Sequence, residues 1–248
     1  SGWMNGVLGV DGTKGYLVTP ADEKYVGEQL DVIEKLWFSS YSDDFLKEFL
    51  PVKIMLCSEI DSVYVTWDFS VTPVQMKYLS QEVQSWYNYD NICVSYGNIV
   101  VTQMTKEDSL AFRSSISRTF IESMIGRGKT APTTEFGESA NYDISSSDMY
   151  TASKLWAAGI PQLVNSAISE DNDWKTFMMM MVLCPEEFLT RVPEYNSDWD
   201  STSKNWDGIL NPVKDVNGLL KKRYDMVRDY FIENYNMDLQ KVGNILNR

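Results

Sequence analysis

Residues 105–126 read TKEDSLAFRSSISRTFIESMIG, and this stretch decides the fold that the sequence predicts. Thr105 followed three residues later by Asp108 is a helix start of the capping-box kind, and Gly126 is a stop signal. Large apolar side chains recur at intervals of four, at Phe112, Ile116, Phe120 and Met124. Because residues four apart share one face of a helix, we predict a core-packed helix over 106–125.

The hundred residues before this helix contain the strand signals. Short apolar runs bounded by turn residues predict strands at 16–18, 52–57 and 63–69, with one or two more within 92–101. The stretch 74–89 fits either a helix or extended chain.

Two helices are expected among these strands. Thr19 and Pro20 supply an N-cap and a first-turn proline for a helix that runs to about Phe38. Spacings of four, three and four give this helix one apolar face, made of Val26, Leu30, Ile33 and Trp37. A shorter helix over 43–50 ends at Pro51.

Helical patterns dominate the rest of the chain. Helices are predicted around 148–158, over about 174–183, through Val216, Leu220, Tyr224, Val227 and Phe231, and after Asp238, where Leu239, Val242 and Leu246 are expected to be buried. The run Met178–Met181 covers every side of its helix, which indicates a helix buried all round. Strands first and helices afterwards predict a single α+β domain over 1–248, with sublobes at about 1–128 and 129–248.

Charge and composition narrow the range of partners. The chain has 22 Lys and Arg against 35 Asp and Glu, a formal charge of -13, which opposes phosphate backbones, so no nucleic acid is expected. The longest apolar stretch, 178–184, is about a third of the ~20 residues that a membrane span needs. Three widely spaced cysteines, Cys57, Cys93 and Cys184, are expected to be free buried thiols, with one disulfide left open if the chain is exported.

Four stretches of the chain share a family pattern. They are 24–58, 117–125 (SRTFIESMI), 159–177 (GIPQLVNSAISEDNDWKTF) and 222–239, which holds KRYDMVRDYFIEN and MDL. The order and the local sequences of these stretches resemble those of the zinc-binding metallopeptidases found as exported lipoproteins in Bacteroidetes. The resemblance implies a zincin-like α+β fold, with a mixed sheet in the N-terminal part, a long former active-site helix and a helical C-terminal lobe.

The zinc-binding motif of that family is absent here. An HExxH helix places two histidines on one face to bind zinc, and its glutamate polarises a zinc-bound water. By the resemblance the ligand positions are Arg118 and Glu122, and the general-base position is Thr119. A guanidinium has no lone pair to offer, threonine has no basic group, and the chain contains no histidine. We therefore expect no zinc, no other cofactor and no catalytic residue.

Two interpretations of Arg118 and Glu122 remain open from their spacing. An i, i+4 pair of opposite charges is common on a solvated helix face, where it adds about 0.2–0.5 kcal/mol. The resemblance instead implies a desolvated pair in the former active-site cleft, which we expect. It also makes Asp173, Trp174 and Thr176 possible ligand-contacting residues, although Thr176 replaces an acid of the family.

These observations predict an exported binding or scaffolding protein that has lost peptidase activity. The resemblance implies a lipid anchor upstream of Ser1, a place in a glycan-uptake system, and a glycan, a peptide or an outer-membrane protein as partner. Surface aromatic residues could stack on sugar rings, and two stretches supply them: Trp86, Tyr87 and Tyr89 in one, Trp199 and Trp206 in the other. The alternative is a hydrolase that uses cleft carboxylates on a glycan or peptide without zinc.

Overall fold

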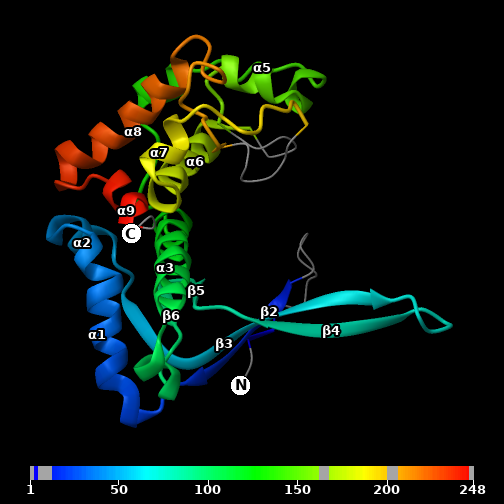
Figure 1. The fold of residues 1–248 in the computed structure, drawn as a ribbon, viewed down its shortest axis with the longest axis vertical. Helices are drawn as coiled ribbons and strands as arrows, with labels where there is room; N and C mark the ends of the chain where they lie inside the picture. Colours follow the sequence, from blue (N-terminus) through cyan, green and yellow to red (C-terminus); the bar gives the residue numbers. More distant parts are fainter. Residues whose placement is uncertain (1–2, 5–12, 162–167, 200–205, 246–248) are drawn as a thin grey trace. The chain divides into compact units, whose positions relative to one another are not determined.

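The computed structural model describes residues 3–4, 13–161, 168–199 and 206–245 (Figure 1). Helices and a mixed sheet confirm the predicted α+β class. The chain divides into two compact units, which we name the sheet unit (1–39 and 51–123) and the helical unit (40–50 and 124–248). Residues 40–50 therefore belong with the C-terminal helices, although they precede most of the sheet in sequence.

A six-stranded mixed sheet organises the sheet unit. Five strands follow the order β1-β2-β3-β6-β5, and β4 pairs with β3 outside that path. The strands are β1 (Trp3–Met4), β2 (Thr13–Pro20), β3 (Lys53–Asp68), β4 (Gln75–Glu82), β5 (Ser85–Asn88) and β6 (Asn91–Val94). The β3–β6 pair is parallel and the other pairs are antiparallel.

The strand β3 joins two strands that the sequence predicts separately. It runs without a break for 16 residues, so the predicted strands at 52–57 and 63–69 are parts of one element. Its first part pairs with β6, and its last part pairs with β4 to form a two-stranded ribbon (Figure 1). The ambiguous stretch 74–89 is extended, as β4 and β5. The predicted strand at 92–101 ends at Val94, and a 3-10 helix, η3 (Ile99–Gln103), follows.

The first helix begins later than predicted. Asp22 accepts a hydrogen bond from the Lys24 backbone N–H at 3.0 Å and starts η1 (Glu23–Tyr25) and then α1 (Val26–Leu36). Thr19 and Pro20 are instead the last residues of β2, so the predicted N-cap is wrong. The extended chain continues because Pro20 pairs with Cys57 in the sheet.

A buried glutamine changes which side of α1 faces the sheet. Leu30, predicted to be buried, is 49% exposed, whereas Gln29 is fully buried. The Gln29 Nε2 group donates to three backbone carbonyls, that of Cys57 within β3 (3.1 Å) and those of Val94 (3.0 Å) and Ser95 (2.8 Å) at the end of β6. Because unpaired buried carbonyls are costly, this amide anchors α1 to the sheet through polar contacts that an apolar pattern does not reveal.

The helix that decides the fold forms as predicted, as α3 (Lys106–Gly126). Thr105 Oγ1 accepts from the Asp108 N–H at 3.1 Å, and Asp108 Oδ2 accepts from the Thr105 N–H at 2.9 Å, which is a reciprocal capping box. Its four regularly spaced apolar side chains, Phe112, Ile116, Phe120 and Met124, are fully buried. Trp37 meets Phe120 edge to face at 5.4 Å between ring centroids, so α1 packs against α3.

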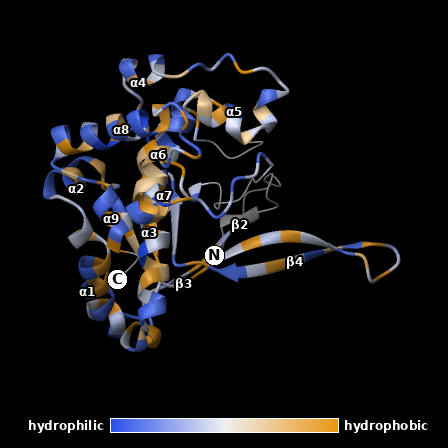
Figure 2. Ribbon diagram, turned by 45° about the horizontal axis from the view of Figure 1, so that its top comes forward, coloured by the Kyte–Doolittle hydropathy of each residue, from blue (hydrophilic) through white to orange (hydrophobic). Residues whose placement is uncertain are grey.

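The helical unit contains the remaining helices. They are α2 (Asp43–Phe49), α4 (Thr134–Glu138), η4 (Asp148–Tyr150), α5 (Ala152–Ala157), α6 (Glu170–Leu183), α7 (Glu186–Thr190), α8 (Leu219–Tyr235) and α9 (Gln240–Ile245). The four methionines of α6 are buried, as predicted, and Figure 2 shows the hydrophobic character of this helix. Val216 is 69% exposed and precedes α8, while Leu246 lies outside the described residues.

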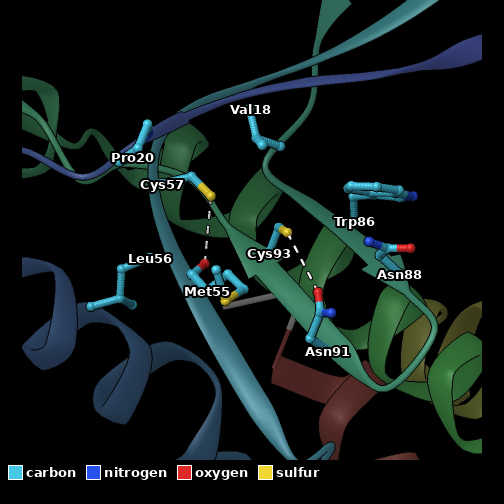
Figure 3. Close-up of a pocket in the computed structure, with 9 residues that line it drawn as sticks. All are labelled: Val18, Pro20, Met55, Leu56, Cys57, Trp86, Asn88, Asn91 and Cys93. Carbon is cyan, nitrogen blue, oxygen red and sulfur yellow. Dashed lines mark hydrogen bonds between the residues drawn. The ribbon is translucent and has the colours of Figure 1, made fainter. Parts of the chain in front are cut away.

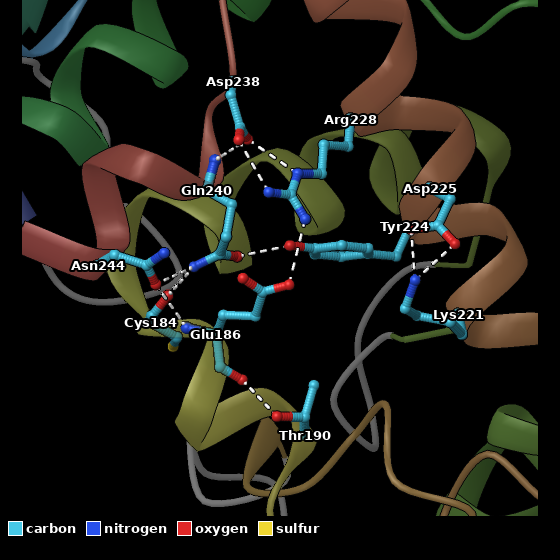
Figure 4. Close-up of polar contacts among 10 residues, drawn as sticks. All are labelled: Cys184, Glu186, Thr190, Lys221, Tyr224, Asp225, Arg228, Asp238, Gln240 and Asn244. Carbon is cyan, nitrogen blue, oxygen red and sulfur yellow. Dashed lines mark hydrogen bonds and ion pairs between the residues drawn. The ribbon is translucent and has the colours of Figure 1, made fainter.

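Polar contacts hold α7, α8 and α9 together (Figure 4). The Arg228 guanidinium donates to both oxygens of Asp238, at 2.9 and 2.8 Å, and to Glu186 at 3.1 Å. Asp238 also accepts from the Gln240 N–H at 3.1 Å and thereby starts α9, as the sequence predicts. The Tyr224 hydroxyl donates to Gln240 Oε1 at 2.7 Å, so α9 is joined to α8 at two points.

None of the described helices combines the length and the apolar composition that a membrane crossing requires. Gly243 in α9 lies so close to the end of α6 that a Cβ would be 2.3 Å from the Met181 carbonyl oxygen and 2.4 Å from that of Cys184. A Cβ on Gly27 in α1 would meet nothing within 4 Å.

These two glycines predict opposite effects of the same substitution. Gly243→Ala forces backbone atoms apart and is expected to lower the free energy of unfolding by about 1–3 kcal/mol. Gly27→Ala, the control, is expected to raise it by up to about 1 kcal/mol, since alanine favours a helix over glycine. Urea unfolding followed by circular dichroism measures both changes, and a neutral Gly243→Ala variant would contradict the close α6–α9 packing.

Candidate functional site

A pocket of about 410 Å³ opens where α3 meets the edge strand β5 and the chain before it. We name it the aromatic pocket. Its lining combines aromatic rings with hydroxyl, amide and charged groups, and consists of Tyr16, Val83, Gln84, Ser85, Trp86, Tyr87, Ser115, Arg118, Thr119 and Glu122. All three positions that the resemblance assigns to the former zinc motif, Arg118, Thr119 and Glu122, are among them.

Hydroxyl contacts fix β5 on α3. Ser85 is 7% exposed, and its Oγ lies 2.8 Å from Ser115 Oγ and 2.8 Å from Thr119 Oγ1. Residues three, four and seven apart lie on one helix face, so Ser115, Arg118, Thr119 and Glu122 face the same side of α3. The Ser85 contacts therefore determine which part of α3 borders the aromatic pocket.

The two charged residues of the pocket differ from expectation in their burial. Glu122 is half-buried, but Arg118 is exposed, although both line the pocket. A guanidinium in contact with water keeps its hydration, so the predicted desolvated pair is wrong. Both groups line the pocket, Arg118 as a cationic donor and Glu122 as an acceptor.

Aromatic side chains form the other side of the pocket. Tyr16 from β2 and Trp86 from β5 are stacked, with ring centroids 4.4 Å apart and an angle of 18° between the planes. Tyr87 follows on β5 and also lines the pocket. The sequence identified Trp86 and Tyr87 as candidate sugar-stacking residues. It missed Tyr16, because only the pairing of distant strands brings that residue to the site.

The other aromatic candidates lie elsewhere. Tyr89, in a left-handed conformation with a φ of 59°, is 89% exposed and outside the lining of this pocket. Trp199 is 73% exposed. Trp206 donates through Nε1 to the Pro161 carbonyl at 3.3 Å, which gives it a structural contact in the helical unit.

The lining does not fit a catalytic zinc. At the three former motif positions, Arg118 is a cation that repels a metal ion, and the Thr119 hydroxyl is hydrogen-bonded to Ser85 at 2.8 Å. Glu122 is one carboxylate, whereas a catalytic zinc takes three protein ligands and an activated water. No reaction step is therefore assigned to a metal at this pocket.

The predicted ligand contacts of Asp173 are wrong, because this residue belongs to the core of the helical unit. Asp173 and Arg223 are both fully buried, and the Arg223 Nη2 atom lies 3.1 Å from Asp173 Oδ2. The Tyr142 hydroxyl donates to the same oxygen at 2.8 Å, and burial raises the pKa of this tyrosine. The Arg223 guanidinium also lies over the Phe136 ring at 4.1 Å. Asp173 thus balances a buried cation.

Trp174 and Thr176 are also structural. Trp174 is 1% exposed, and its Nε1 donates to Thr130 Oγ1 at 3.0 Å. The Thr176 hydroxyl donates to the Asn172 carbonyl one turn earlier, at 2.7 Å, which is a local helix contact. Both side chains therefore make these contacts within the helical unit.

The fold resembles that of a crystallised protein from Bacteroides caccae named a "putative zinc-binding metallo-peptidase". Sequence identity is 10% and the TM-score 0.48, over 93% of this chain and 78% of that one. No protein-family model and no curated protein sequence matches the chain. A likeness at this level assigns no site or activity, so the account of function rests on the pocket itself.

Truncation of Asp173 and of Glu122 should lower the free energy of unfolding by different amounts. Asp173→Ala leaves the Arg223 cation buried without its counter-charge and is expected to lower the free energy of unfolding by about 3–5 kcal/mol. Glu122→Ala, the control at the pocket, is expected to cost less than about 1 kcal/mol, since its partner position Arg118 is exposed. The urea unfolding midpoints of the two variants measure this difference in stability. A double Asp173→Leu, Arg223→Met variant should be more stable than Asp173→Ala alone, and equal or lower stability would contradict the role of the stranded charge.

Proposed function

We propose that this protein is a non-catalytic binding protein and that the aromatic pocket holds a sugar ring of a glycan. The observation that supports this proposal is the lining, where Tyr16, Trp86 and Tyr87 lie beside hydroxyl, amide, guanidinium and carboxylate groups. An aromatic ring packs against the C–H face of a sugar, while polar groups bond its hydroxyls. The volume of about 410 Å³ lies within the ~300–1,000 Å³ range of small-ligand sites.

The same lining argues against hydrolysis. A glycosidase that uses two carboxylates needs a second acid about 5–9.5 Å from the first. Among the described residues that line the aromatic pocket, Glu122 is the one carboxylate. The pocket serines would need a base to become nucleophiles, and the chain has no histidine to act as one. Binding without turnover is therefore the function that this chemistry supports best.

The cellular setting of the proposal comes from the sequence resemblance. We place the protein outside the cell membrane, with a lipid anchor upstream of Ser1, as a binding or scaffolding component of a glycan-uptake system. The four matching stretches support this setting, and the aromatic pocket supplies a site for the glycan. An outer-membrane protein of the same system is the partner expected for the scaffolding role.

Glycan affinity should depend on the pocket side chains. We expect isothermal titration of the full chain with neutral hexose and uronic-acid oligosaccharides to find one that binds. Tyr87→Ala should weaken this binding about fivefold, since one lost aromatic stack costs about 1 kcal/mol. Arg118→Ala should weaken uronic-acid sugars most, because the guanidinium pairs with a carboxylate. Trp67→Ala, an exposed aromatic on the ribbon outside the pocket, is the control. Unchanged affinity in both pocket variants, or binding of a peptide panel alone, would overturn the assignment.

Chelation should leave the protein unaffected. Because the lining does not fit zinc, incubation with EDTA is expected to change neither the glycan affinity nor the melting temperature. Product analysis after long incubation with the same oligosaccharides should find no shortened chains. Release of products that EDTA suppresses would show that a metal acts at the site and would contradict the proposal.

A further inference from the structure

A second pocket, of about 160 Å³, lies in the sheet unit between β3 and β6 (Figure 3). Met55, Cys57 and Cys93 are among its lining residues, and we name it the sulfur pocket. Both cysteines are free and 4% exposed, whereas Met55 is 48% exposed. Two thiols thus lie inside the pocket, and a thioether lies where the pocket meets solvent.

Strand register explains why the three sulfur atoms share one pocket. Met55 and Cys93 are direct partners in the parallel pairing of β3 with β6, so their side chains leave the sheet on the same face. Cys57 lies two residues further along β3, which returns its side chain to that face. Figure 3 shows the two thiols in the same hollow, with the Met55 side chain beside them.

We propose that Met55, Cys57 and Cys93 together bind one soft monovalent metal ion, Cu(I). Thiolate and thioether sulfurs are the ligands that Cu(I) prefers among protein groups. Its three proposed ligands come from β3 and β6 and do not line the aromatic pocket, although Trp86 lines both pockets. A tetrahedral zinc site takes four ligands, commonly thiolates or imidazoles, and three sulfurs with one exposed thioether suit Cu(I) better.

Copper binding exchanges protons for the metal ion. Cu(I) binds the thiolate form of cysteine, so Cys57 and Cys93 each release their proton to solvent as the two copper–sulfur bonds form. The Met55 thioether carries no proton and contributes a neutral third ligand.

The surroundings favour a metal ion over a direct sulfur–sulfur bond. Cys57 lies diagonally from Cys93 in the register, and a disulfide requires sulfur atoms about 2.0 Å apart. Two metal–sulfur bonds of about 2.3 Å each span a wider gap. Asn91 Oδ1 accepts from the Cys93 thiol at 3.8 Å, and an amide can turn its NH₂ group towards a thiolate once the proton has left.

The test is an anaerobic competition of the reduced full chain with the Cu(I) complex of bicinchoninate, which reports copper transfer by loss of its colour. The full chain is expected to remove one equivalent of copper. Cys57→Ser and Cys93→Ser should each weaken binding about a hundredfold or more, and Met55→Leu about tenfold, since ligand loss costs at least as much as loss of an outer-shell partner. Cys184→Ser and Met76→Leu, a thiol and an exposed thioether outside the pocket, should leave affinity unchanged.

X-ray absorption of the copper-loaded chain gives a result that does not depend on how the cysteine variants fold. Three sulfur neighbours are expected in the native chain and two in Met55→Leu. Three results would each overturn the proposal. They are copper binding by the native chain no tighter than by Cys57→Ser, a coordination shell that Met55→Leu leaves unchanged, and a Cys57–Cys93 disulfide in place of bound copper.

Discussion

The hydroxyl contacts of Ser85 with Ser115 and Thr119 are the interaction on which the candidate site depends. They fix the edge strand β5 on α3 at two points, each 2.8 Å between oxygens. Because β5 is short, this anchor determines where Trp86 and Tyr87 lie beside Arg118 and Glu122. The pocket is thus defined by hydroxyl groups that hold its two sides together.

Burial explains why two pairs of opposite charge have different roles. Arg223 and Asp173 are fully buried, so each needs the other, and Tyr142 and Phe136 complete the surroundings of the cation. Arg118 is exposed, so water satisfies it and a ligand can displace that water. Charged side chains therefore stabilise the core of the helical unit in one place and line a pocket of the sheet unit in the other.

The strand β3 connects the two pockets of the sheet unit. Its parallel pairing with β6 brings Met55 and Cys57 beside Cys93, and its antiparallel pairing with β2 brings Tyr16 near Trp86. Trp86 lines both pockets, which makes β5 the shared side. A strand that pairs on both sides can therefore organise two separate sets of side chains, since alternate residues face opposite sides of a sheet.

The sequence by itself determined what depends on local spacing and on composition. Residues close together in the chain account for the capping box at Thr105, the buried face of α3, the all-round burial of Met178–Met181 and the Asp238 cap. Composition alone excludes histidine as a metal ligand or base, because the chain contains none. Tertiary structure alone decided the contacts between distant segments. Gln29 donates to carbonyls of β3 and of the end of β6, Tyr16 stacks on Trp86, and Arg223 contacts Asp173, fifty residues away in the chain. Local patterns record which residues prefer burial, but the partners of buried polar groups are set by how distant elements pack.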